Sequence, residues 1–156
     1  MTESVSIRQA LEKSGVITIN PKGRSMFPYI KDTYTVVIER PSRPLEKYDC
    51  VLFFERENVY VLHRLLSIDG DVLHIMGDNN PHYDRPVDRK EIVGVLVGFY
   101  KPNGKYVEVY RKKTPLSVKF GCLPPVKHVR ILFWRAVGKL GRIFKKIFGK
   151  KQKNET

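Results

Sequence analysis

Apolar and polar positions along the first 110 residues form short runs rich in Val, Ile, Leu, Phe and Tyr, separated by turn-forming sequences. The breaks include the Pro-containing stretch 41–44, Asp69-Gly70-Asp71, the stretch 77–81 and Pro102-Asn103-Gly104. Short strands at roughly ten-residue spacing, with turn signals between them, predict a mainly-β domain that is curled and barrel-like. We expect strands over 16–20, 34–39, 50–55, 59–68, 72–76, 92–100 and 106–110.

Two further segments have helical patterns. Ser6 is a suitable N-cap with Gln9 three residues later, and Gly15 is a suitable stop, so we predict a short helix over 6–14. After a domain over 1–113 and a Pro-containing linker over 114–125, residues 126–150 predict an amphipathic helix, followed by a tail over 151–156. Its apolar face comprises Val129, Leu132, Phe133, Ala136, Val137, Leu140, Ile143, Phe144, Ile147 and Phe148. Its polar face comprises Arg135, Lys139, Arg142, Lys145 and Lys146, with Ile131 and Trp134 displaced toward it.

Composition limits the classes of protein that this chain can represent. Its 156 residues are 42% hydrophobic and 11% aromatic, which suits one domain with a buried core and excludes global disorder. The formal net charge of +13 is uneven, because residues 1–125 carry a net +4 and residues 126–156 a net +9. Cys50 and Cys122 are too few for a disulfide framework, so we expect reduced thiols in a cytoplasmic protein. No apolar run reaches the roughly 18 residues of a membrane span, and we expect neither a secretory signal nor an N-terminal anchor.

The sequence Gly23-Arg24-Ser25-Met26-Phe27-Pro28 follows the first predicted strand and has the most specific chemistry in the chain. A tight loop there exposes one serine hydroxyl and can direct backbone N–H groups at an oxyanion that develops on an attacked carbonyl. A serine hydroxyl is a weak nucleophile until a neighbouring base removes its proton. Taken alone, the six residues fit both a nucleophile loop and a plain turn with a capping serine.

A series of boxes over residues 16–100 resembles the serine peptidases of the signal peptidase I and LexA-like superfamily. The Ser25 loop is similar to the family's Gly/Ser-x-Ser-Met-x-Pro motif, which implies that Ser25 is the nucleophile and that Met26 and Pro28 contact substrate. The further boxes stand in the family's order at 28–32, 47–53, 61–65, 77–80 followed by Asp84, and 92–95. The resemblance therefore implies the mainly-β fold of this superfamily.

The resemblance also implies a general base. His63 stands where bacterial signal peptidases and LexA-like proteins have a lysine, as in the endoplasmic-reticulum type of signal peptidase. A neutral imidazole can take the Ser25 proton and return it to the leaving amine, although an ordinary histidine on a strand face is the alternative. Asp78 and Asp84 reproduce the spacing of two aspartates that matter in that type. Either can orient the His63 ring; we favour Asp84 for this role and Asp78 as a support of its loop.

Some positions depart from the family pattern. Gly23 stands where many signal peptidases have a hydroxyl residue, so we expect an oxyanion hole of backbone groups that includes the Ser25 N–H. Arg24 and Tyr48 stand where the family often has glycine. His74, Asp78 and His82 have a metal-like spacing, but the turn at 77–81 excludes the helix on which that spacing works. We expect no metal and no organic cofactor.

These observations predict a serine endopeptidase that cleaves a leader or precursor peptide, or its own chain, through an acyl-enzyme. Without an N-terminal anchor, cleavage of secretory preproteins is not expected. The basic helix predicts peripheral attachment to the anionic inner membrane face, with Trp134 at the headgroup boundary, and packing on the β domain is the alternative. Nucleic acid is not expected as a partner, because aromatic platforms do not interleave with the basic residues. The rival interpretation is a non-catalytic membrane-surface or peptide-binding module on a peptidase-like fold.

Overall fold

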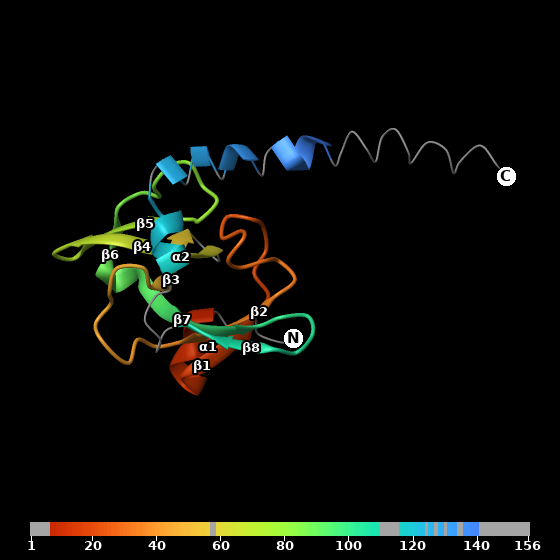
Figure 1. Ribbon diagram of the computed structural model, residues 1–156. Coiled ribbons are helices and arrows are strands. Elements are labelled where there is room, and N and C mark those ends of the chain that lie inside the picture. Colours follow the sequence, from red (N-terminus) through yellow and green to blue (C-terminus); the bar gives the residue numbers. More distant parts are fainter. Residues whose placement is uncertain are drawn as a thin grey trace.

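One antiparallel sheet of eight strands forms the centre of the molecule (Figure 1). The computed structural model describes residues 7–56, 59–109, 116–123, 125–126, 128–129, 131–133 and 136–140. The strands are β1 Val16–Ile19, β2 Thr35–Glu39, β3 Cys50–Arg56, β4 Val59–Asp69, β5 Val72–Met76, β6 Val87–Asp88, β7 Ile92–Tyr100 and β8 Tyr106–Glu108. The helices are α1 Ile7–Ser14, the 3₁₀ turn η1 Arg89–Glu91 and α2 Leu116–Gly121.

The strands follow the order β1-β2-β7-β3-β4-β5-β6, and β8 pairs with β7. The mainly-β class predicted from the sequence is confirmed, but the sheet is not closed into a barrel. Register shifts such as the one between Leu65 and Ser67 bend the strands. Closure needs pairing between the two end strands, and β6 offers only two residues for it.

The short N-terminal helix is present as α1, close to its predicted bounds. Three elements differ from the expectation: β6 and η1 were not predicted, and α2 occupies part of the expected linker over 114–125. The prolines and glycine of that segment suggested a linker. They also fit a helix, because proline is favoured near helix starts and glycine near helix ends.

Both faces of the sheet are buried, which explains the four consecutive buried residues at the start of β3. Cys50 and Leu52 belong to one core cluster, and Val51 and Phe53 belong to the other. Helix α1 contributes Leu11 to the first cluster, which also contains Met26 and Ile30 from the connection between β1 and β2. The connection that includes Ser25 is therefore attached to the core directly after the serine.

Candidate active site

Ser25 lies in a tight loop between β1 and β2. Gly23 has φ +94°, a left-handed conformation that disfavours residues with a Cβ atom. The N–H of Phe27 donates to the carbonyl of Arg24 at 3.1 Å, and the N–H of Ile30 donates to the carbonyl of Met26 at 2.9 Å. Burial of Met26 and Ile30 then fixes the loop, and Ser25 remains half-buried.

The loop over 77–80 supports the Ser25 loop from a distant part of the chain. The Asn79 N–H donates to the Ser25 carbonyl at 2.6 Å, and Asn79 Nδ2 donates to the Arg24 carbonyl at 3.1 Å. A Cβ atom on Gly77 would lie 2.8 Å from the Ser25 carbonyl oxygen, so the approach requires glycine. Within the described part of the chain the Ser25 N–H donates no hydrogen bond, which leaves it available to an oxyanion.

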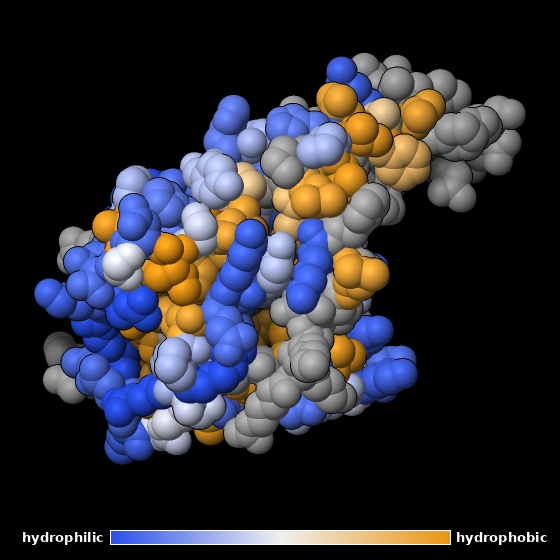
Figure 2. Space-filling view, turned by 60° about the vertical axis from the view of Figure 1, so that its left-hand side comes forward, coloured by the Kyte–Doolittle hydropathy of each residue, from blue (hydrophilic) through white to orange (hydrophobic). Residues whose placement is uncertain are grey.

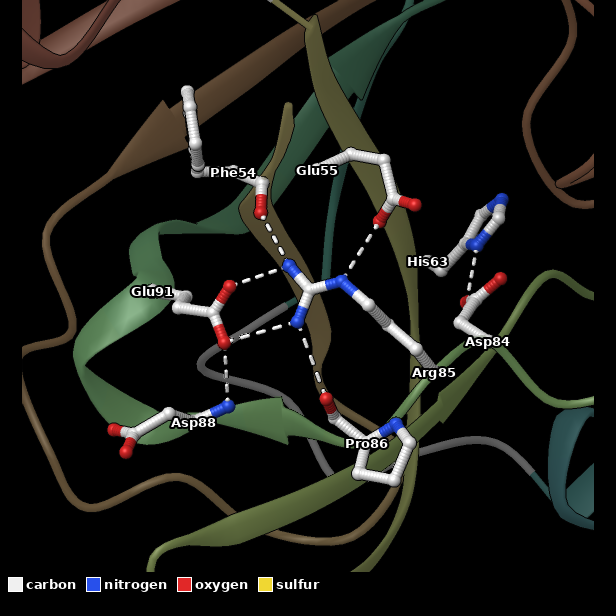
Figure 3. Close-up of polar contacts among 8 residues, drawn as sticks. All are labelled: Phe54, Glu55, His63, Asp84, Arg85, Pro86, Asp88 and Glu91. Carbon is white, nitrogen blue, oxygen red and sulfur yellow. Dashed lines mark hydrogen bonds and ion pairs between the residues drawn. The ribbon is translucent and has the colours of Figure 1, made fainter. Parts of the chain in front are cut away.

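His63 lies on β4 and is 5% exposed. Its Nδ1 contacts Asp84 Oδ2 at 2.6 Å, and the N–H of Asp84 donates to the Ile75 carbonyl at 3.0 Å, which ties Asp84 to β5. Figure 3 shows the second ring nitrogen, Nε2, at the end of the imidazole that points away from Asp84. Arg85 extends to Glu91, Glu55 and the Phe54 carbonyl (Figure 3), so it does not compete with His63 for Asp84.

Ser25 and His63 line one cavity of about 260 Å³. Met26, Ile30, Leu52 and Leu62 supply apolar walls. No hydrogen bond joins the Ser25 hydroxyl to His63 among the described contacts. Catalytic hydrogen bonds are often long before substrate binds, so a serine and a histidine in one cavity remain suited to proton transfer.

Asp78 does not contact His63; it pairs with Arg64. Arg64 Nε donates to Asp78 Oδ1 at 2.8 Å, and Nη2 donates to Oδ2 at 2.7 Å. Nη1 donates to the Tyr48 carbonyl at 2.9 Å, and the guanidinium carbon lies 4.7 Å from the centre of the Tyr29 ring. Successive residues of a strand point to opposite faces, so His63 and Arg64 take separate aspartates.

The charge of this pair is buried. Arg64 is 1% exposed. Burial lowers the pKa of its guanidinium, whereas neighbouring Cys50 and Asp78 raise it, and the net shift of the pKa is upward. Burial raises the pKa of the Cys50 thiol to about 12, against a smaller lowering by Arg64. Burial likewise raises the pKa of Tyr29 to about 12. Cys50 is therefore a neutral thiol near physiological pH and is not a competing nucleophile.

The remaining positions singled out from the sequence have mixed placements. Met26 lines the Ser25 cavity, whereas Pro28 is exposed and does not line it. Arg24 stacks over the Phe27 ring at 5.5 Å and lines a neighbouring cavity of about 310 Å³. Tyr48 has φ +81°, the conformation that glycine adopts most readily. Asn79 and Gly77 were not predicted to support the Ser25 loop, because their contacts join distant segments.

The described residues include no group of three or more His, Cys, Asp or Glu side chains placed to hold a metal ion. The ring of His74 contacts that of Tyr83, with centroids 6.4 Å apart. No helix in the described ranges is long and apolar enough to cross a membrane. A scan against protein-family models gives no match for the chain, and a search of curated proteins gives none either.

The described residues between 125 and 140 are helical and extend away from the sheet (Figure 1). Ile131, expected toward the polar side, is buried at 4% exposure. Five residues of the predicted apolar face, which we call the tail face, are 40% to 68% exposed: Val129, Leu132, Phe133, Val137 and Leu140. Apolar side chains gather on this part of the surface in Figure 2. Lys139 is exposed, and Trp134, Arg135, Arg142, Lys145 and Lys146 lie outside the described residues.

Proposed function

We propose that the chain is a serine endopeptidase in which Ser25 is the nucleophile, His63 the general base and Asp84 the group that orients the imidazole. The observation that carries this proposal is the shared cavity of Ser25 and His63, with Asp84 held 2.6 Å from the far side of the ring. A carboxylate on Nδ1 favours the tautomer whose free Nε2 can accept a proton, and it stabilises the imidazolium that forms.

The reaction follows from these positions. His63 Nε2 takes the hydroxyl proton as Ser25 Oγ bonds to the peptide carbonyl carbon, and the carbonyl oxygen becomes an oxyanion. The Ser25 N–H stabilises that oxyanion. His63 then passes its proton to the leaving amine as the C–N bond breaks, which leaves an acyl-enzyme. Water attacks the ester by the same proton transfers and releases the acid product.

The sheet offers two strand edges to an extended peptide. Strand β1 stands at one end of the sheet, and β5 pairs with β4 only from Arg64 onward. In the described part of the chain, no strand covers the outer edge of β1 or the second edge of the 59–63 segment of β4. Ile19 from β1 and Tyr60 from β4 both line the Ser25 cavity. A peptide added along such an edge gains main-chain hydrogen bonds and presents its carbonyl to Ser25.

Two backbone features support the resemblance to signal peptidases. Tyr48, at a position where that family usually has glycine, has a positive φ. Gly77 allows the 77–80 loop to approach the Ser25 carbonyl closely. Position 48 therefore has the backbone conformation of a glycine, and position 77 has no room for a Cβ atom, as the family pattern implies.

Cleavage of a proteome-derived peptide pool, with new termini identified by mass spectrometry, tests the proposal. We expect wild-type protein to generate new termini, and Ser25→Ala and His63→Ala to generate none. Ser42→Ala and His82→Ala are matched controls at exposed positions outside the cavity and should cleave like wild type. Equal products from wild type and Ser25→Ala would favour the non-catalytic alternative.

The tail face favours attachment at an anionic membrane surface. Its apolar residues are exposed, and residues 126–156 carry ten basic side chains and one acidic side chain. Such a helix lies in the interface with its apolar face in the acyl region and its cations at the headgroups. Leu132→Ser/Val137→Ser should weaken co-sedimentation with phosphatidylserine-containing vesicles, while the exposed Val72→Ser should not. Concentration-dependent self-association without vesicle binding would assign the face to a second copy of the chain.

A further inference from the structure

Two lysines line the Ser25 cavity. Lys22 precedes the serine by three residues and Lys31 follows Ile30 at the end of the loop; both are exposed and both belong to the cavity lining. Among the residues that the structure describes, no acidic side chain lines this cavity. Within the described residues neither lysine forms an ion pair. The carboxylate of Asp84 contacts the His63 ring instead of a lysine. Lys31 also lines the neighbouring cavity, together with Asp32, which is not part of the Ser25 cavity lining.

These two cations give the mouth of the cavity a positive potential. Charges of one sign at a cleft concentrate oppositely charged ligands there, because the low-dielectric walls focus the field. A peptide at the β1 or β4 edge rises about 3.3 Å per residue, so several of its side chains pass the lysines. A carboxylate among them gains two partners, whereas a basic side chain meets repulsion.

We propose that this site selects peptides with an acidic residue within about three residues of the scissile bond, and that Lys22 and Lys31 bind the carboxylate of this residue. The proposal rests on the peptidase function proposed above and names its substrate class. The proposal also favours cleavage of another protein over cleavage of the chain's own tail. Residues 126–156 contain one acidic residue among ten basic ones, so this segment is a poor substrate for a site rimmed by lysines.

The test compares matched peptides. From one peptide cleaved by the wild type, versions carrying Asp, Asn or Lys beside the scissile bond are prepared, and kcat/KM is measured for each. The wild type should prefer Asp over Asn by roughly three- to tenfold. The double variant Lys22→Glu/Lys31→Glu should lose that preference and favour the Lys peptide. As a control, Lys105→Glu reverses one exposed charge outside the cavity and should keep the preference for Asp.

The possible outcomes distinguish the two proposals. Wild-type cleavage without preference for Asp, or a preference unchanged in the double variant, would overturn the role of the lysines while leaving the peptidase function intact. Lysine variants that cleave normally but lose binding to anionic vesicles would assign the lysines to a membrane and overturn the inference. A preference for Asp that fades at about 1 M salt, where the Debye length is about 3 Å, supports it. A wild type with no Ser25-dependent cleavage refutes the peptidase function itself, and the inference with it.

Discussion

Replacement of Asp84 by asparagine separates catalysis from stability. Asparagine keeps the size of the side chain but removes the negative charge that lies against His63 Nδ1. Unit charges about 4 Å apart interact by about 4 kcal/mol at an effective dielectric constant near 20. The Asp84 side chain is 19% exposed, so water screens part of this interaction. We therefore expect the imidazolium, and the transition state that contains it, to lose about 3–4 kcal/mol in Asp84→Asn.

That loss corresponds to a decrease of about 10²–10³-fold in the rate of the chemical step. The assay is the rate of covalent labelling of Ser25 by a fluorophosphonate probe, which needs no knowledge of the natural substrate. Urea denaturation of the same variant should show a change in the free energy of unfolding of about 1 kcal/mol or less, because a neutral hydrogen bond replaces a charge-assisted one.

Asp78→Asn is the matched control, with the same chemical change on the other aspartate. Arg64 is buried, so loss of its carboxylate partner leaves an uncompensated charge and should cost about 3–5 kcal/mol of unfolding free energy. Asp78→Asn that remains folded should label much faster than Asp84→Asn. Labelling of Asp84→Asn within threefold of wild type would refute the orienting role of Asp84.

Two further changes test the surroundings of the site. Gly77→Ala places a methyl group 2.8 Å from the Ser25 carbonyl oxygen. We therefore expect the rate of labelling to fall by about tenfold or more and the free energy of unfolding to fall by about 1–3 kcal/mol. Unchanged labelling would show that the contact between the two loops is unimportant. The thiol of Cys50 has its pKa raised from 9.0 to about 12, so the unfolded chain releases this proton first and stability falls as pH rises from about 9 toward 12. In urea titrations, the free energy of unfolding of the wild type should fall by about 2–3 kcal/mol between pH 9 and 11. That of Cys50→Ala should fall by less over the same interval. Equal losses in the two proteins would contradict a thiol that is buried and neutral.

The sequence predicted the larger part of the fold because long strands have a clear apolar signal. The run from Cys50 to Phe53 is continuous because both faces of the sheet are buried, and its length still marks it as a strand. Strand β6 has two residues and therefore no period to detect. Helix α2 has six residues, and the proline before it in the sequence and the glycine at its end are equally typical of a linker.

The sequence predicts which residues belong to the candidate site better than it predicts which of them contact one another. Ser25 and His63 were identified from local motifs, and the structure places both in one cavity. Spacing could not decide between Asp78 and Asp84, because the path of the turn after β5 determines which carboxylate meets His63. The partner of Arg64 and the contact of Asn79 with Arg24 depend on packing between distant segments, which no local pattern encodes.

The central claim is that Ser25 is a nucleophile activated by His63, and covalent labelling followed by peptide mapping tests it most directly. Full-length wild type treated with a fluorophosphonate should carry one adduct, mapped to Ser25, and His82→Ala should label equally well. Ser25→Ala should carry no adduct, and His63→Ala should label at least 10²-fold more slowly, because general-base catalysis is lost. An adduct on another residue, or equal labelling of wild type and His63→Ala, would contradict the account.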